Sequence, residues 1–166
     1  MGIKYELAQE IMARIYDIAK TLNMEHLKLS GIYALRSRGT GSRRTIARCH
    51  ALSKILQLAL GINAVYLIEV ISEKFDRMTR EEQDKVLIHE LLHIPLSFGG
   101  GFKHHDFVQE RNVEKIYEKY KQLKGLNIKS DVNHVQTEIK KHEQKKKSFF
   151  GGGWFYITSC KLKAYN

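Results

Sequence analysis

The stretch VLIHELLHIPLSFGGGFKHHDF, residues 86–107, gathers four histidines and one glutamate around the chain's only proline and three consecutive glycines. His89 and His93 stand four residues apart, and residues at this spacing share one face of a helix. Two imidazoles on one face are suitable ligands for zinc, which prefers tetrahedral sites with nitrogen donors. Glu90 lies about 100° further around the helix than His89. We therefore expect Glu90 to take a proton from a metal-activated water and not to ligate the metal itself.

A catalytic zinc needs a third protein ligand and an open position for water. The candidates follow the glycines, where His104 and His105 are adjacent. A reversal of the chain between Pro95 and Gly101 would carry them back beside the first two histidines. His104 is preferred because, if Phe107 packs inward, the residue three positions earlier shares its helical face. His105 is the alternative.

Two helices are predicted to position these ligands. Thr79 and Glu82 match the capping-box pattern, so we expect the first helix to begin there. It should end before Pro95, which lacks a backbone donor and restricts the residue before it. The second helix is expected to begin at His104 and to end at Gly125.

Upstream, three apolar segments, 27–36, 44–52 and 63–71, predict strands, and the first two are expected to pair as a hairpin with a basic tip. Glu69, inside the third segment, is expected to face solvent. Residues 5–22 have the periodicity of an amphipathic helix, whereas 53–62 fit either a short helix or a continued strand. The predicted fold class is α+β, with a small sheet of about three or more strands packed on the HExxH helix and a following helix carrying the third ligand.

The composition limits the class of protein. A chain of 166 residues with 43% hydrophobic content can form one domain with an appendage, which we divide into a catalytic domain (1–125) and a segment (126–166) that packs on it. The second part combines a basic helical arm with an aromatic C-terminus. The sequence contains no run of eighteen apolar residues and no signal-peptide pattern. Cys49 and Cys160 lie far apart without CxxC spacing. We expect a reduced, cytoplasmic protein without a membrane partner.

The formal net charge of +10 is concentrated partly in Arg36–Arg44 and Lys140–Lys147. Such segments favour nucleic acid through neutralisation of phosphates, but a solubilising surface explains them about equally well. One alternative function is therefore a nucleic-acid-associated protein with a structural or inactive metal site.

HELLHIP, preceded by YLIEVISEKFD and followed by a glycine-rich turn and an H-x-x-F motif, resembles the phage and archaeal metallopeptidases. These are zincins similar in outline to the SprT-like proteases, and the resemblance covers roughly residues 27–108. It implies a zinc-dependent hydrolase of proteins or peptides, with Zn²⁺ held by His89, His93 and His104 and Glu90 as general base. A second alternative, by analogy with SprT-like proteases, is a protease that acts on proteins bound to DNA. The longer HExxHxxGxxH spacing is absent, which disfavours a metzincin.

Overall fold

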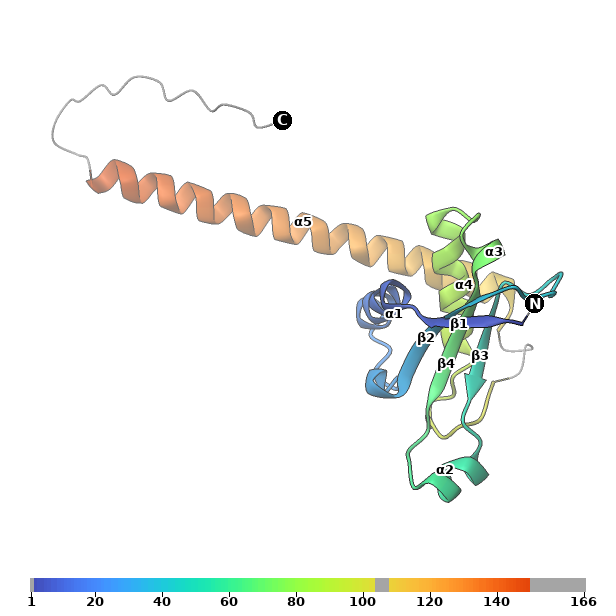
Figure 1. The fold of residues 1–166 in the computed structure, drawn as a ribbon. Coiled ribbons are helices and arrows are strands. Elements are labelled where there is room, and N and C mark those ends of the chain that lie inside the picture. The colour runs from blue at the N-terminus through green and yellow to red at the C-terminus, as the bar shows by residue number, and fades with distance from the viewer. Residues whose placement is uncertain (1, 104–107, 150–166) are drawn as a thin grey trace. The chain divides into compact units, whose positions relative to one another are not determined.

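The computed structural model describes residues 2–103 and 108–149 of the chain, which divides into two compact units, Met1–Gly125 and Leu126–Asn166. The first unit contains a four-stranded sheet and several helices, which confirms the α+β class (Figure 1). The elements are β1 (Lys4–Leu7), α1 (Gln9–Thr21), a 3₁₀ turn (Leu29–Gly31), β2 (Ile32–Arg38), β3 (Ala47–Ala51), α2 (Lys54–Leu60), β4 (Tyr66–Ile71), α3 (Ser72–Phe75), α4 (Arg80–Leu92) and α5 (Glu110–Phe149).

The sheet is mixed, with the strand order β1-β2-β4-β3. β2 and β4 are parallel, and the other two pairs are antiparallel. The predicted hairpin between the first two apolar segments is therefore wrong, because β4 lies between β2 and β3. The physical reason is burial: nearly every residue of β4 is buried, which suits an interior strand, whereas β3 carries Arg48 and His50 and takes an edge.

The predicted N-terminal helix is wrong in its first turn. Residues Lys4–Leu7 form an exposed edge strand paired with β2, and α1 begins only at Gln9. The Ala8 N–H donates to the Ala34 carbonyl at 3.0 Å, which extends the pairing to the start of the helix. Pairing with the free edge of β2 provides hydrogen-bond partners that residues 4–7 would lack as a first helical turn.

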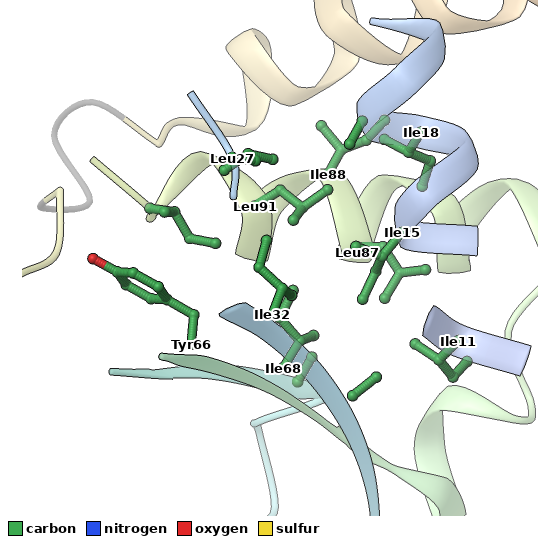
Figure 2. Close-up of a cluster of buried hydrophobic side chains, with 14 of the residues drawn as sticks. Ile11, Ile15, Ile18, Leu27, Ile32, Tyr66, Ile68, Leu87, Ile88 and Leu91 are labelled. Atoms are coloured by element: carbon green, nitrogen blue, oxygen red, sulfur yellow. The ribbon is translucent and has the colours of Figure 1, made fainter. Parts of the chain in front are cut away.

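The core lies between the sheet and the helices α1 and α4 (Figure 2). Both helices present one aliphatic stripe to the sheet, as expected for amphipathic helices that cover a sheet face. The buried side chains labelled in the figure are Ile11, Ile15 and Ile18 from α1, Leu87, Ile88 and Leu91 from α4, Ile32, Tyr66 and Ile68 from the sheet, and Leu27.

Glu69 was expected to face solvent, and the structure contradicts this. Its side chain is 4% exposed, and its Oε2 accepts hydrogen bonds from Arg48 Nη1 at 3.3 Å and from His50 Nε2 at 2.8 Å. The pairing of β3 with β4 brings these two basic side chains onto the face of Glu69. A buried carboxylate is tolerated because it has these partners.

The structure also decides the remaining element boundaries. Segment 53–62 forms the helix α2, which ends at Gly61 with a positive φ of 64°. The helix predicted from His104 begins only at Glu110 and continues through Gly125 to Phe149. A single glycine costs about 1 kcal/mol in a helix, too little to end one among strong helix formers. The aromatic C-terminus falls largely in residues 150–166, outside the described part of the chain. Among the described residues, no helix has the length and apolar character needed to cross a membrane.

Candidate metal centre and its groove

The helix α4 begins and ends where the sequence predicts. Thr79 Oγ1 accepts a hydrogen bond from the Glu82 N–H at 3.3 Å, and Glu82 Oε2 accepts one from the Thr79 N–H at 2.8 Å, so the capping box is confirmed. His89 and Glu90 lie in the last turn, and His93 is the C-terminal capping residue. The fixed helix start and the buried leucines and isoleucine of α4 therefore position both histidines at its C-terminal end.

The imidazole rings of His89 and His93 converge. Their Nε2 atoms lie 3.2 Å apart, and the ring planes are inclined by 75°. Two nitrogens bound to one tetrahedral zinc, each at its usual bond length, lie about 3.4 Å apart. The two donor atoms are thus spaced as a shared zinc ion requires, and the donor set fits this metal.

A main-chain contact orients His93. Its Nδ1 lies 2.9 Å from the carbonyl oxygen of Lys103, and the Lys103 N–H donates to the His93 carbonyl at 2.8 Å. Because a carbonyl oxygen only accepts, this contact favours the tautomer of a neutral His93 with its proton on Nδ1, in which Nε2 carries the lone pair that a metal ligand needs. The expected reversal across residues 95–101 is confirmed, since it returns the chain to His93.

The two candidates for the third ligand, His104 and His105, lie outside the described residues. The reason for preferring His104 was its face on a helix beginning at that residue, and this reason is removed because α5 begins at Glu110. A third ligand at one of these two histidines is supported by the preceding residue, Lys103, whose carbonyl oxygen contacts His93. Within the described ranges, no group of three or more His, Cys, Asp or Glu side chains could hold a metal.

Glu90 is 7% exposed and lies beside the edge strand β3. Burial raises the pKa of its carboxyl group to about 7, although a hydrogen bond from the main chain of Cys49 acts in the opposite direction. Burial, together with the charge of Glu90, raises the pKa of the Cys49 thiol to about 12. Cys49 is therefore a neutral thiol near neutral pH, whereas the carboxyl group of Glu90 can exchange a proton in that range.

A groove runs along α4 beside β3, with a volume of about 1020 Å³. The hydrogen bonds from Leu52 to Val65 and from Ile71 to Ile46 fix which main-chain groups of β3 face β4. By alternation, the main-chain groups of Ala47, Cys49 and Ala51 point to the outer edge of β3, which we call its open edge because no other described strand pairs with it. The residues that line the groove are Arg44–His50 from β3 and its approach, Met78, Glu82, Lys85, Val86, His89, Glu90 and His93 from α4 and its approach, Phe102, and Glu110, Val113 and Glu114 from α5.

Sequence reasoning missed the contribution of the loop before His104. The carbonyl of Lys103 acts through the main chain, so no residue type could reveal it. Tyr66, a buried tyrosine on β4, holds this loop: its hydroxyl donates to the Gly101 carbonyl at 3.0 Å and accepts from the Gly100 N–H at 2.9 Å. The only signal in the sequence of this loop was the aromatic residue Phe102, which lines the groove.

Comparisons with known proteins give one match. The model of a family described as "Putative phage metallopeptidase" matches residues 3–143. No curated protein and no solved structure matches the chain. No contact among the described residues supports the alternative of nucleic-acid binding. Arg36 in the basic segment is already paired with Glu10 and Asp76, each at 2.6 Å.

Proposed function

The chain belongs to the family of putative phage metallopeptidases, and on that premise we propose that it is a zinc-dependent peptidase with its catalytic unit in residues 1–125. Membership implies a metal, hydrolytic chemistry, and proteins or peptides as substrates. The observation that carries the more specific proposal is the pair of imidazole Nε2 atoms 3.2 Å apart, beside the buried carboxyl group of Glu90.

The metal would be held by Nε2 of His89 and Nε2 of His93. The Lys103 carbonyl supports this assignment, because it favours the tautomer of His93 that a metal ligand needs. We propose His104 as the third ligand, with His105 as the alternative, since both follow the residue that contacts His93. Zinc fits the nitrogen donors better than the hard cations, which prefer oxygen.

A bound zinc ion supplies Lewis acidity, which lowers the pKa of water and polarises a carbonyl group. Glu90 would accept the proton of the attacking water and return it to the leaving amine. The substrate would lie extended along β3, hydrogen-bonded to the open main-chain groups of Ala47 and Ala51. This position brings the peptide bond to the carboxyl group of Glu90, which the main chain of Cys49 holds at the same edge.

The replacement Glu90→Gln tests the proposal. It keeps the shape of the side chain but removes the base, so we expect an unchanged zinc content and a loss of at least about 100-fold in casein hydrolysis. Glu81→Gln, an exposed position on the same helix, is the matched control and should retain activity. Full hydrolysis by the Glu90→Gln protein would rule out Glu90 as the base.

The same experiment addresses the alternative of an inactive or structural metal site. That alternative predicts zinc binding without hydrolysis in the unaltered protein as well as in the variant. No contact among the described residues favours it, nor does any favour a SprT-like activity on DNA-bound proteins.

A further inference from the structure

Helix α2 exposes its aliphatic side chains to solvent. Ile55 is 76% exposed, Leu58 85% and Leu60 60%. The inward side chain is instead polar: Gln57 Nε2 donates to the Leu52 carbonyl at 2.7 Å and to the Gly99 carbonyl at 3.3 Å. Single exposed apolar residues are ordinary, but a contiguous group of them indicates an interaction surface. We call Ile55, Leu56, Leu58, Leu60 and Ile62 the α2 apolar patch.

The patch adjoins the groove of the candidate metal centre. Only Leu52 and Ser53 separate the end of β3 from α2, and Figure 1 shows α2 at that end of the strand. The bond from Gln57 to Gly99 ties α2 to the loop that leads to Phe102. Phe102 is 47% exposed and lines the groove. An occupant that leaves the groove along β3 therefore meets the patch next.

Charge distinguishes the two ends of the groove. Residues 26–68, which include β3 and α2, contain no Asp or Glu. At the other end, Glu82, Glu110 and Glu114 line the groove. The segment at the α2 end thus contributes no carboxylate, and it exposes the aliphatic side chains of the α2 apolar patch, which suit apolar side chains of a bound chain.

On its inner side β3 pairs antiparallel with β4. A bound polypeptide that pairs with the outer edge of β3 in the same antiparallel sense would place its N-terminal part beyond Ala51, toward α2. Cys49 lies beside Glu90, and Lys54 begins α2 five residues later. At about 3.3 Å per residue in both strands, the patch is reached about four to six residues before the cleaved bond.

We propose that the α2 apolar patch is a docking surface for the substrate, an extended polypeptide with apolar residues about four to six positions N-terminal to the cleaved bond. The proposal rests on the peptidase function proposed above. Folded proteins bury such runs, so the substrate class is unfolded or partly unfolded chains. A second copy of this chain and a lipid surface are the competing occupants.

Binding is tested first, with the full zinc-loaded chain carrying Glu90→Gln to prevent cleavage. The probes are two fluorescein-labelled peptides, one with an apolar N-terminal half and a polar C-terminal half, the other with the halves exchanged. Fluorescence anisotropy should give the first peptide an affinity about tenfold higher, which corresponds to the burial of roughly one leucine. Adding Ile55→Ser and Leu58→Ser together should abolish the difference. Leu7→Ser, 67% exposed on β1, is the matched control and should preserve it.

Equal affinities for the two peptides, or a preference that survives the double replacement, would overturn the docking proposal. If the double variant keeps the peptide preference but changes the sedimentation mass, the patch serves self-association and the docking proposal is wrong. If it keeps the preference but changes the binding to phosphatidylcholine–phosphatidylglycerol vesicles, the patch binds lipid and the proposal is equally wrong. Cleavage of the same peptides by the Glu90-containing chain is measured separately. There the patch should lower KM for the apolar-first peptide without changing kcat. Absence of cleavage with the binding preference intact would contradict the peptidase function and not the docking surface.

Discussion

At the scale of single residues, the state of His93 depends on one main-chain oxygen. The Lys103 carbonyl favours the proton on Nδ1 and fixes the plane of the ring, so Nε2 faces His89. Such outer contacts orient a ligand before the metal arrives and raise its affinity. The loop that ends at Lys103 is consequently part of the candidate metal site, to which it contributes a main-chain oxygen.

Glu69 is the residue for which the structure predicts a pH effect on stability. Burial raises the pKa of its carboxyl group, but the hydrogen bond from His50 and the charge and hydrogen bond of Arg48 act in the opposite direction, and the pKa lies below the ordinary value of 4.5. Because the folded-state pKa is lowered, this contribution to stability is present above pH 4.5 and is lost as the pH falls through the folded-state value.

We therefore expect Glu69→Gln to lower the free energy of unfolding by about 1–2 kcal/mol at pH 7 and to flatten its decline toward acid. Urea unfolding between pH 7 and pH 3 measures both effects. The exposed Glu25 provides the control, and Glu25→Gln should keep the slope of the unaltered protein. An unchanged acid slope in the Glu69 variant would show that the pairing with His50 and Arg48 contributes nothing.

At the scale of elements, the loop between α4 and α5 depends on Gly100. Its φ is +88°, and a Cβ there would meet the side-chain nitrogen of Gln57 and lie 2.5 Å from the Leu52 carbonyl. A residue with a side chain must shift the loop away from α2 and thereby disturb the contact between Lys103 and His93.

Gly100→Ala should therefore weaken zinc binding about tenfold, as loss of an outer contact to a ligand does. Competition with a fluorescent zinc chelator measures this affinity. Gly99→Ala is the matched control, because the nearest atom to its Cβ is Ser97 Oγ at an ordinary 3.6 Å. Equal zinc affinities of the two variants would contradict the role of this loop.

A buried ion pair joins α1 to α4. Arg14 Nη2 lies 2.5 Å from Asp84 Oδ1, and the two side chains are 8% and 10% exposed. The same guanidinium donates to Gln83 Oε1 at 2.6 Å. Removal of Arg14 leaves the buried Asp84 with only the exposed Arg80, at 3.8 Å, as an ion-pair partner among the described residues. We therefore expect Arg14→Met to lower the free energy of unfolding by about 3 kcal/mol.

Arg80→Met is the control for this pair, because Arg80 also faces Asp84 but is 67% exposed at 3.8 Å. Its loss should change stability by less than about 1 kcal/mol. Similar effects of the two replacements in urea unfolding would mean that burial of the Arg14 pair is without consequence.

The accuracy of the sequence predictions differed between elements for physical reasons. The helix α4 was predictable because its signals, a capping box and a proline, act locally. The order of the strands was not, since the central position of β4 depends on burial on both faces. β1 was missed because four exposed residues have no periodic signal, and α5 was cut short at Gly125 because a glycine weakens a helix without ending it.

At the scale of the whole molecule, three parts of the first unit lie in sequence along β3: the histidines of α4, the open edge of β3, and the α2 apolar patch. The convergence of His89 and His93 at one end of α4 was predictable from their spacing. The groove beside them was not, because it is assembled from β3, α4 and α5, which are separate in sequence. The central claim is that this assembly holds one zinc ion at the two histidines.

Native mass spectrometry of the full chain, with and without His93→Ala, tests that claim most directly. After removal of metals with a chelator and addition of zinc, we expect one zinc ion per unaltered chain and restored casein hydrolysis. The His93→Ala chain should remain folded by circular dichroism but lose both the zinc ion and hydrolysis. An unaltered chain that hydrolyses casein without zinc, or a His93→Ala chain that retains the ion, would contradict the claim.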